Sequence, residues 1–420
     1  RRYLPGGEEI TAVRAAAFDR FNAVGLPHRR VEAWRYTDLR TQMKEAKRLA
    51  SLPDDAAKAK AREAKDLFAG AGFRKLAIVD GAFVPELSDL ADLEPGLTIQ
   101  PMADALAADR PLLSQRLGPV VPDDDPALAL NTALAANGVV ILVAPGTALS
   151  RPIHVAFVTT NWVATSMFTR SQVNIGAGAS ATIVESHQGP DGSDYQVNTA
   201  MQLVVGDEAR IDHVKVVSEG NSALHISSLL ANIGARATFN QLGFVAGGGL
   251  VRNQLFVHIA GEGTIADIRC GALLSGTQHA DTTLAIEHAA ENCQSRETFK
   301  AVVDDTARAV FQGKITVSPG AQKTDAKMMS RALLLSDEAE ADSKPELEIF
   351  ADDVQCGHGT TTGAIDDELL FYLMARGIPP KEAKALLIQA FIGEIIEGAA
   401  NESVRAALTE AMLGWLGQRE

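Results

Sequence analysis

Two residues in the stretch "ADDVQCGHGTTTG", which runs from Ala351 to Gly363, have side chains that could do chemistry together. Cys356 and His358 are separated by one residue, and residues i and i+2 of a β-strand point to the same face. Their thiol and imidazole would therefore lie side by side, and both groups are good ligands for iron or zinc. A structural zinc site takes four ligands, so the remaining ligands must come from elsewhere in this chain or from a partner.

Two other interpretations of this pair stay open. Cys356 could be a small apolar core residue, or its thiol could be a nucleophile activated by the imidazole, as in a Cys–His hydrolase. No oxyanion-hole or substrate-pocket signal accompanies the pair, which disfavours the hydrolase. Gly357 and Gly359 leave the flanks of the strand free for the close approach of another chain. The other eight histidines are expected to be surface or hydrogen-bonded core residues, and they are His28, His154, His187, His213, His225, His258, His279 and His288.

The strand that carries this pair follows a long region, about 139–350, whose sequence repeats. A glycine, two residues, a small residue, one residue and an apolar residue recur from Gly178, Gly206 and Gly234, with a looser copy from Gly261. The interval between successive glycines is thus nearly constant. A fixed period of this size with alternating strand patterns between the turns predicts stacked β-rungs, a β-solenoid. A β-sandwich is the alternative, because short strands with regular turns also suit that fold.

Helical patterns flank the β-region. The segment 1–75 has a helical texture, and the segment 364–420 predicts three helices, of which two begin at the capping residues Asp366 and Asn401. Asp125 and Pro126 predict a further helix before the β-region, and Asp80–Gly81 predicts a hairpin turn. We therefore expect a mainly β chain in four parts, which are an N-terminal helical domain (1–75), a mixed α/β connecting segment (76–138), the β-solenoid core (139–363) and a C-terminal helical domain (364–420).

The composition excludes several classes of protein. The chain has 420 residues, 46% of them hydrophobic and 22% charged, which is typical of a soluble globular protein. A formal charge of −14 argues against nucleic-acid binding, because phosphate affinity comes mostly from Lys and Arg. The aliphatic run Val139–Val143 is far too short to span a membrane, and the N-terminus lacks the apolar segment of a secretory signal. Three scattered cysteines argue against a disulfide framework and indicate a reducing cytoplasm.

The sequence contains no motif that predicts an ATP site. The segment "GAGASA" at Gly176–Ala181 matches G-x-G-x-x-A, but the sequence after it is strand-like, whereas the dinucleotide motif needs a helix there. The sequence also lacks the pattern G-x-x-x-x-G-K-[ST]. If ATP takes part in the function, another chain must bind it.

Three segments resemble a known family. The segment "KPELEIFADDVQCGHGTTTGAIDDELLFYLMARGI", Lys344–Ile378, resembles the C-terminal signature of the SufB/SufD family of iron–sulfur cluster assembly proteins, and Ala321–Ile349 resembles the segment before it. "GLPHRRVEAWRYTDL", Gly25–Leu39, is similar to a segment of the SufD branch. The resemblance covers both ends of the chain and agrees with the repeat between them.

This resemblance implies a right-handed parallel β-helix core with helical domains at both ends. It also implies a non-catalytic scaffold subunit that pairs with SufB through the β-helix and docks the ATPase SufC through the C-terminal helices. A transient iron–sulfur cluster would form at the interface with SufB, with His358 as a ligand and Cys356 as a second candidate. The isolated chain could form a homodimer, because an open edge strand invites pairing. The alternatives are a purely structural adaptor of such a complex and a β-helix enzyme that acts on polysaccharides.

Overall fold

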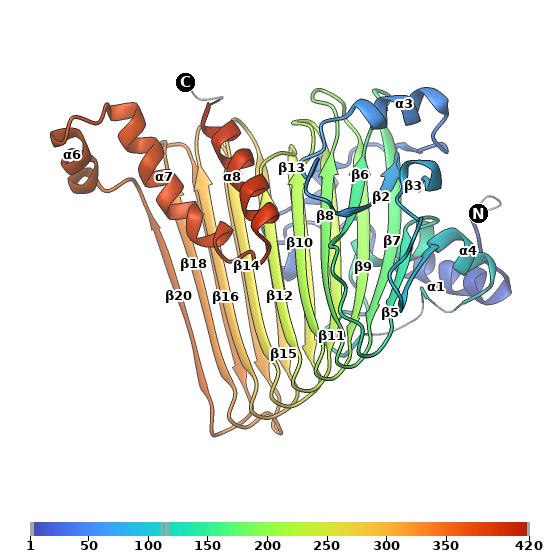
Figure 1. Cartoon of the computed structure of the whole chain (residues 1–420). Coiled ribbons are helices and arrows are strands. Elements are labelled where there is room, and N and C mark those ends of the chain that lie inside the picture. The colour runs from blue at the N-terminus through green and yellow to red at the C-terminus, as the bar shows by residue number, and fades with distance from the viewer. Residues whose placement is uncertain (1–3, 111, 114–116, 418–420) are drawn as a thin grey trace.

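A parallel β-helix of two facing sheets forms the centre of the computed structural model, which describes residues 4–110, 112–113 and 117–417 (Figure 1). Successive strands of the repeat alternate between the two sheets, so each rung of the helix contributes one strand to each sheet. The predicted β-solenoid is confirmed. The β-sandwich alternative is wrong, because the neighbouring strands of the long repeat are parallel.

The first sheet, sheet A, carries the odd-numbered strands of the repeat and begins with β4. Its members in spatial order are β4 (Leu97–Pro101), β5 (Val139–Val143), β7 (Thr165–Ile175), β9 (Gln196–Val205), β11 (Leu224–Ile233), β13 (Leu250–Ile259), β15 (His279–His288), β17 (Arg308–Val317) and β19 (Glu340–Ile349). The short strand β1 (Arg48–Leu49) pairs with β7 beside this path. The strand β4 runs antiparallel to its neighbour β5.

The second sheet, sheet B, carries the even-numbered strands of the repeat. Its members in spatial order are β3 (Ala82–Phe83), β2 (Arg74–Val79), β6 (Ile153–Val158), β8 (Ser180–Gln188), β10 (Arg210–Ser218), β12 (Thr238–Val245), β14 (Ile265–Leu274), β16 (Gln294–Val303), β18 (Asp325–Leu334) and β20 (Gln355–Gly363). The predicted hairpin at Asp80–Gly81 joins β2 to β3, and both turn residues have the positive φ that such a tight turn requires.

The register of the strands corrects one detail of the predicted repeat. Ile211 lies opposite Ala181, so Gly206 corresponds to Gly176 and not to Gly178. Rung lengths also vary, because the step from Gln294 to Asp325 is longer than the step from Thr238 to Ile265. The sequence repeat therefore marks the turns of the solenoid, whereas the backbone ladder sets which residues stack.

Alternate residues of each strand face the space between the sheets, and there they form continuous rows along the solenoid axis. Two rows of sheet B are used below. The Cys356 row consists of Ala181, Ile211, Phe239, Ala266, Ser295, Ala326 and Cys356. The His358 row consists of Ile183, His213, Gln241, Ile268, Glu297, Met328 and His358. Most members of the Cys356 row are apolar and buried, whereas the His358 row mixes apolar and polar residues.

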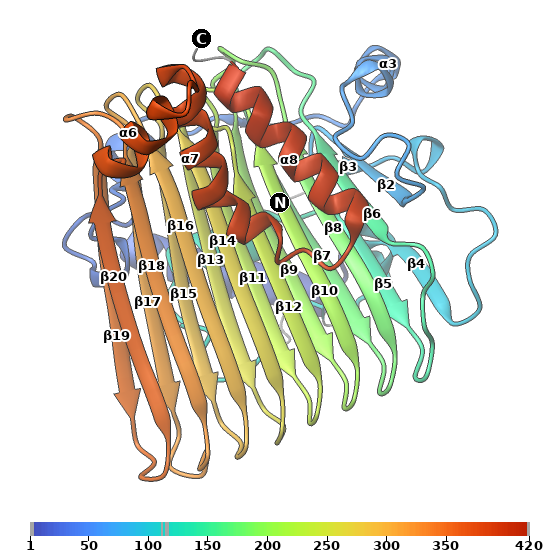
Figure 2. The same ribbon diagram turned by 60° about the vertical axis from the view of Figure 1, so that its left-hand side comes forward.

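The C-terminal helices lie on the outer face of sheet B (Figure 2), and N-terminal segments pack on sheet A. On sheet A, Trp34 and Ala127 share a core cluster with Leu224, and on sheet B, Ile392 of α7 shares one with Phe244. The helices are α1 (Glu8–Val24), α2 (Leu39–Gln42), α3 (Asp55–Glu63), α4 (Met102–Ala107), α5 (Pro126–Leu134), α6 (Asp367–Ala375), α7 (Pro380–Ile396) and α8 (Glu402–Gly417), with the 3₁₀ turns η1 (Glu32–Trp34) and η2 (Pro85–Leu87). No helix of the described residues is long and apolar enough to cross a membrane.

Most predicted helix starts are confirmed. Asp125, Asp366 and Asn401 each accept a hydrogen bond from a backbone N–H of the first turn, as helix caps do. The N-terminal region is less helical than expected. Between Lys44 and Gly70 only α3 is helical, and β1 extends sheet A instead.

One buried ion pair anchors the N-terminal segment on sheet A. The fully buried guanidinium of Arg252 on β13 pairs with Asp281 on β15. It also donates a 2.7 Å hydrogen bond to the carbonyl oxygen of Ala33 and lies 4.3 Å from the ring centroid of Trp34. The hydroxyl of Thr37 donates to the same carboxylate. The segment that resembles the SufD branch thus has a structural role in joining η1 to the solenoid.

The solenoid ends at an uncovered rung made of β19 and β20 (Figure 2). Among the described residues each of these strands has a ladder partner on one side only, which is β17 for β19 and β18 for β20. β19 is rich in acidic side chains and contains Pro345, and both features protect an edge strand against unwanted pairing. β20 has no acidic residue and no Lys or Arg, so its outer edge is chemically different.

Candidate functional site

Cys356 and His358 lie in inward-facing rows at the uncovered end of sheet B. Cys356 pairs in register with Ala326, and His358 pairs with Met328, and both of these partners are buried core residues. The predicted same-face arrangement is therefore present. Cys356 is half-buried and packs against the solenoid core, whereas His358 is exposed. The pair forms the outermost part of the interior, and no further rung of the described chain encloses it.

The surroundings of Cys356 favour its neutral thiol. Burial raises the pKa of Cys356, a backbone hydrogen bond at Ala326 lowers it by less, and the carboxyl groups of Asp325 and Glu297 raise it further. A thiol with a raised pKa is a poor nucleophile, so the Cys–His hydrolase interpretation gains no support.

The glycines beside the pair leave open space on the outer face of β20. A Cβ added to Gly357 would meet nothing within 4 Å, and one added to Gly359 would meet only the flexible end of Met329. Neither glycine has a positive φ. Their value here is the absence of a side chain, because a second backbone could approach β20 closely at both positions.

A buried carboxyl group lies behind His358 in the same row. Glu297 on β16 is separated from His358 by Met328, and it is 1% exposed. Neither of its carboxyl oxygens receives a hydrogen bond of normal geometry, and burial raises the pKa of Glu297 to about 8. The hydroxyl of Ser295 is hydrogen bonded to Nε2 of His288 at 2.9 Å instead. Sequence reasoning did not single out Glu297, although its alternation with apolar residues of β16 places it inside.

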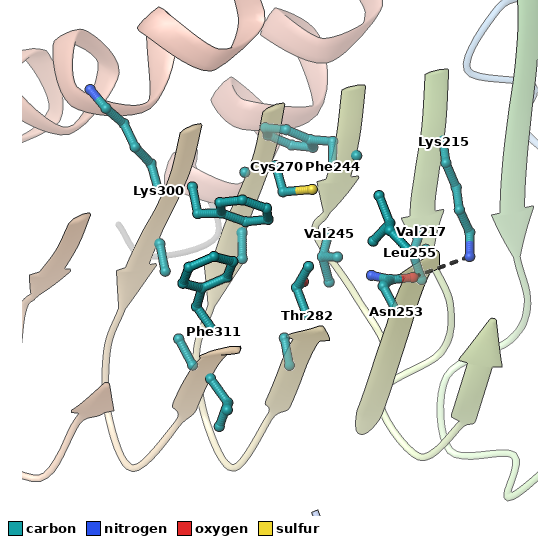
Figure 3. Close-up of a pocket in the computed structure, with 18 of the residues that line it drawn as sticks. Lys215, Val217, Phe244, Val245, Asn253, Leu255, Cys270, Thr282, Lys300 and Phe311 are labelled. Atoms are coloured by element: carbon teal, nitrogen blue, oxygen red, sulfur yellow. Dashed lines mark hydrogen bonds between the residues drawn. The ribbon is translucent and has the colours of Figure 1, made fainter. Parts of the chain in front are cut away.

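A narrow cavity of about 70 Å³ runs inside the solenoid toward this end (Figure 3). It is bordered by Glu185 and Lys215 at one end and by Thr362 of β20 at the other. Between them lies Cys270, whose thiol has its pKa raised to about 12 by burial. Gly243 leaves room beside this thiol, because a Cβ there would lie 3.1 Å from its Sγ atom.

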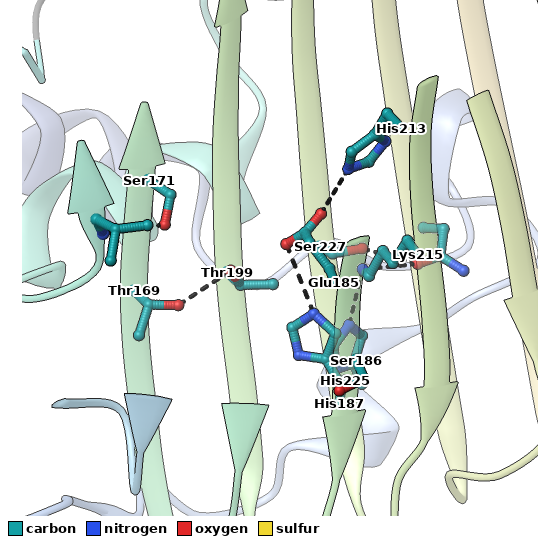
Figure 4. Close-up of polar contacts among 12 residues, drawn as sticks. Thr169, Ser171, Glu185, Ser186, His187, Thr199, His213, Lys215, His225 and Ser227 are labelled. Carbon is teal, nitrogen blue, oxygen red and sulfur yellow. Dashed lines mark hydrogen bonds and ion pairs between the residues drawn. The ribbon is translucent and has the colours of Figure 1, made fainter. Parts of the chain in front are cut away.

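A buried polar cluster lies at the inner end of this cavity (Figure 4). Glu185 on β8 accepts a 2.9 Å hydrogen bond from His213 Nε2, and its other oxygen lies 3.7 Å from His187 Nε2. Burial alone would raise the pKa of Glu185, but its contacts with the two histidines hold that pKa well below its usual range. Lys215 on β10 donates to Asn253 and lies 3.0 Å from His225 Nε2, and burial lowers the pKa of Lys215 to about 8.

The sequence prediction for these histidines is incomplete. His213 and His225 are hydrogen-bonded core residues, as expected, but no expectation placed His187, His213 and His225 in one cluster. The inward orientation of His187 could have been predicted, because side chains of a strand alternate between its faces and His187 continues the inward positions Ile183 and Glu185 of β8. Their partners come from other strands, whose register the variable rung lengths hide.

The C-terminal helices are fixed to sheet B by apolar and polar contacts. Lys300 on β16 donates a 2.8 Å hydrogen bond to the carbonyl oxygen of Phe391 in α7. Gly271 on β14 permits the close contact, because a Cβ there would lie 3.2 Å from both Ile392 and Ile395. The small helix α6 carries several exposed apolar side chains, namely Leu369, Phe371, Tyr372 and Met374. α7 is thus packed on the solenoid, whereas these apolar side chains of α6 are exposed.

Comparison with known proteins agrees with this architecture. The family described as "SUF system FeS cluster assembly, SufBD core domain" matches residues 157–391, and the family "SufBD protein N-terminal region" matches residues 7–155. The iron–sulfur cluster assembly protein SufD of Escherichia coli is 30% identical over 398 residues, which cover 94% of this chain and 89% of that protein.

Two further relatives are similar over nearly the same length. An iron–sulfur cluster assembly SufBD family protein of Synechocystis is 29% identical, with 95% of this chain and 89% of that protein covered. A SufBD family protein of Mycobacterium tuberculosis is 30% identical, with coverage of 94% and 91%. With a matched core domain of more than half its length and a SufD relative at 30% identity, the chain belongs to the SufBD family of iron–sulfur cluster assembly proteins and is SufD-like.

Proposed function

We propose that this chain is the SufD-like subunit of a SufBCD-type scaffold complex in the cytoplasm, on which iron–sulfur clusters are assembled de novo. The observation that carries the proposal is the uncovered last rung, where the exposed imidazole of His358 continues a row of the solenoid interior. A SufB chain would cover this rung and pair with it through its own β-helix. The family membership and the SufD relative support this assignment.

In this proposal the nascent cluster is cargo shared between two chains. Neutral His358 would supply a ring nitrogen to iron, and the remaining ligands would come from SufB. Cys356 would bind only after losing its proton, which its raised pKa opposes until a cation is near. No bond-making catalysis by this subunit is required. The absence of a P-loop sequence fits an ATPase that resides in SufC.

The C-terminal helices would connect the scaffold to SufC. The exposed apolar residues of α6 offer a surface for a protein partner, and α7 is held on β14 and β16 through Lys300 and the contacts at Gly271. Movement of ATP-bound SufC would thus be passed to the solenoid. The four parts of the chain, divided at residues 75, 138 and 363, would then serve as anchor, connector, scaffold and docking domain.

The test is co-expression with a SufB homologue and a SufC homologue, followed by purification without oxygen. We expect a stoichiometric complex that contains iron and sulfide. His358→Ala should leave the complex assembled and reduce bound iron and sulfide by roughly tenfold or more, because a ligand is lost. Thr360→Ala, two residues further along the same strand face, is the matched control and should keep the cluster.

Several outcomes would contradict parts of the proposal. Normal cluster yield in His358→Ala would exclude the ligand role. Normal yield in a Cys356/His358 double variant would favour the purely structural adaptor. Failure of the wild-type chain to join SufB and SufC under conditions where those two chains fold would reject the assignment as a subunit, and only then would a polysaccharide-degradation assay be informative. If the isolated chain forms a homodimer and added SufB dissociates it, the homodimer and the complex with SufB use the same edge.

A further inference from the structure

Three buried side chains inside the solenoid lie close together, and the proposed scaffold function gives them no role. His187 on β8, Glu219 in the turn after β10 and His225 on β11 each offer a ligand atom, and these atoms all lie within 4.8 Å of one another. All three side chains are buried. We propose that they bind one divalent first-row transition-metal ion, of the class of Zn²⁺ or Fe²⁺, several rungs away from His358.

His187 is the residue whose environment most favours a bound ion. Its ring is fully buried, and neither ring nitrogen has a hydrogen bond of normal geometry. Phe157 stacks on one face of the ring with a centroid distance of 4.1 Å, which fixes its plane. Oε2 of Glu185 lies 3.7 Å from Nε2, and Nδ1 has no hydrogen bond. A carboxylate behind a histidine is the usual support of a metal-binding imidazole.

Glu219 is held in place by a second residue. The hydroxyl of Tyr195 donates a 2.5 Å hydrogen bond to Oε2 of Glu219, and the same hydroxyl accepts one from the backbone N–H of Gly220. The second carboxyl oxygen, Oε1, is 3.2 Å from Nδ1 of His225. Because Tyr195 fixes one oxygen, the other is directed at the histidines, as in a carboxylate ligand with an outer hydrogen bond.

His225 completes the set. Its ring centroid lies 4.7 Å from that of His187, edge to face, and its Nε2 atom lies 3.0 Å from Lys215 Nζ. In the metal-free arrangement Nδ1 of His225 faces Oε1 of Glu219, and a bound ion would contact both atoms. The cluster also contains two carboxyl groups, those of Glu185 and Glu219, against the single amino group of Lys215.

The donor set decides which ions fit. Two imidazoles and one carboxylate suit zinc, iron and cobalt, whereas calcium and magnesium prefer oxygen ligands alone. Ligand atoms around a tetrahedral ion lie about 3.4 Å apart, given bonds of about 2.1 Å. The three side chains must therefore close by only a small distance, which side-chain rotations allow.

The test uses the full chain without a histidine tag, in a Cys356→Ser/His358→Ala background, after removal of metal with EDTA. Titration with Co²⁺ alone, followed by visible absorption, should show one ion per chain, and Zn²⁺ should displace it. His187→Gln and Glu219→Gln should each weaken binding by roughly 100-fold. His288→Gln is the matched control, since this equally buried histidine is hydrogen bonded to Ser295 outside the set, and it should leave the affinity unchanged.

Two results would overturn the inference. Unchanged Co²⁺ affinity in His187→Gln would place the ion elsewhere, and no binding by the folded parent chain would show that the three residues form no metal site. If a ligand variant does not fold, X-ray absorption of the Zn²⁺-loaded parent chain identifies the ligand atoms. We expect nitrogen and oxygen scattering with two imidazoles, whereas a sulfur ligand would contradict the proposal, because none of the three residues has one. Metal binding here would not require SufB or SufC.

Discussion

Glu297 and His358 occupy the same inward-facing row of sheet B, and only Met328 separates them. One is a carboxyl group sealed inside the solenoid, and the other is an exposed imidazole at its end. The row therefore connects the candidate site to a titratable group that solvent does not reach. This arrangement makes the stability of the last rungs depend on pH in a way that can be measured.

We predict that Glu297→Gln stabilises the protein at neutral and higher pH. The folded-state pKa of Glu297 is raised from 4.5 to about 8, so the folded chain holds this proton more tightly than the unfolded chain. The contribution of Glu297 to the free energy of unfolding is fully present below pH 4.5. It falls as the pH rises toward 8, by about 1.4 kcal/mol per pH unit. Urea unfolding at pH 8 should show the variant to be more stable by about 4 kcal/mol.

The exposed Glu291 provides the control for that experiment. Glu291→Gln removes a carboxyl group at the surface and should change the free energy of unfolding by less than about 0.5 kcal/mol at either pH. Equal stability of wild type and Glu297→Gln across the whole range would mean that Glu297 is hydrated in the folded chain.

We predict the opposite pH dependence for His288. Burial lowers its folded-state pKa from 6.5 to about 4, so the unfolded chain binds the proton more tightly. The contribution of neutral His288 to the free energy of unfolding is fully present above pH 6.5. It falls as the pH drops toward 4, by up to about 3 kcal/mol in total. His288→Gln should remove this part of the acid sensitivity. The measurement is the change in unfolding free energy between neutral pH and pH 4, and an unchanged difference would show that His288 is protonated when folded.

We predict that Arg252→Ala loosens the N-terminal segment and destabilises the chain by about 3–5 kcal/mol. The change leaves Asp281 buried without its cation and removes the contacts with Ala33 and Trp34. Limited proteolysis should cut near η1 in the variant. Arg236→Ala breaks an exposed pair with Glu208 and should change the stability little, so similar effects of the two changes would argue against this account.

We predict that Gly271→Val displaces α7 from sheet B. The added side chain would meet Phe244, Ile392 and Ile395, and overpacking of this kind costs about 1–3 kcal/mol. Hydrogen exchange should show loss of protection in α7. Gly414→Ala in α8 meets nothing within 4 Å and should be neutral or stabilising. Protection that persists in Gly271→Val would mean that another contact holds the helix.

We predict that Cys356→Ser affects cluster assembly less than His358→Ala. Cys356 is half-buried and its pKa is raised, so its thiol is held neutral beside the core. In the co-expressed complex, iron and sulfide should stay within about threefold of the wild type. A loss as large as that in His358→Ala would make the thiolate an equal ligand.

Much of the fold follows from local patterns in the sequence. The glycine repeat predicts the turns of the solenoid, and Asp125, Asp366 and Asn401 predict helix starts because each cap depends on its own first turn. The placement of Cys356 and His358 on one face follows from strand geometry alone. These features need no information from distant residues.

The interior clusters could not be predicted in the same way. His187 and His225 come close because β8 and β11 belong to opposite sheets, and Glu219 joins them from a turn. Rungs of unequal length change which positions stack on one another. In the first repeat, for example, Gly206 stacks on Gly176 and not on Gly178, which the sequence pattern predicts. Strand parity indicates that His187 points inward, but only the register identifies its neighbours.

The uncovered rung has a thermodynamic consequence. In a one-dimensional stack each rung is held by its neighbours, so the free energy of local opening is lowest where one neighbour is missing. β20, which has β18 alone beside it among the described strands, is expected to fray first and to exchange its amide protons fastest. The stability of this last rung therefore also determines how long Cys356 and His358 keep a fixed separation.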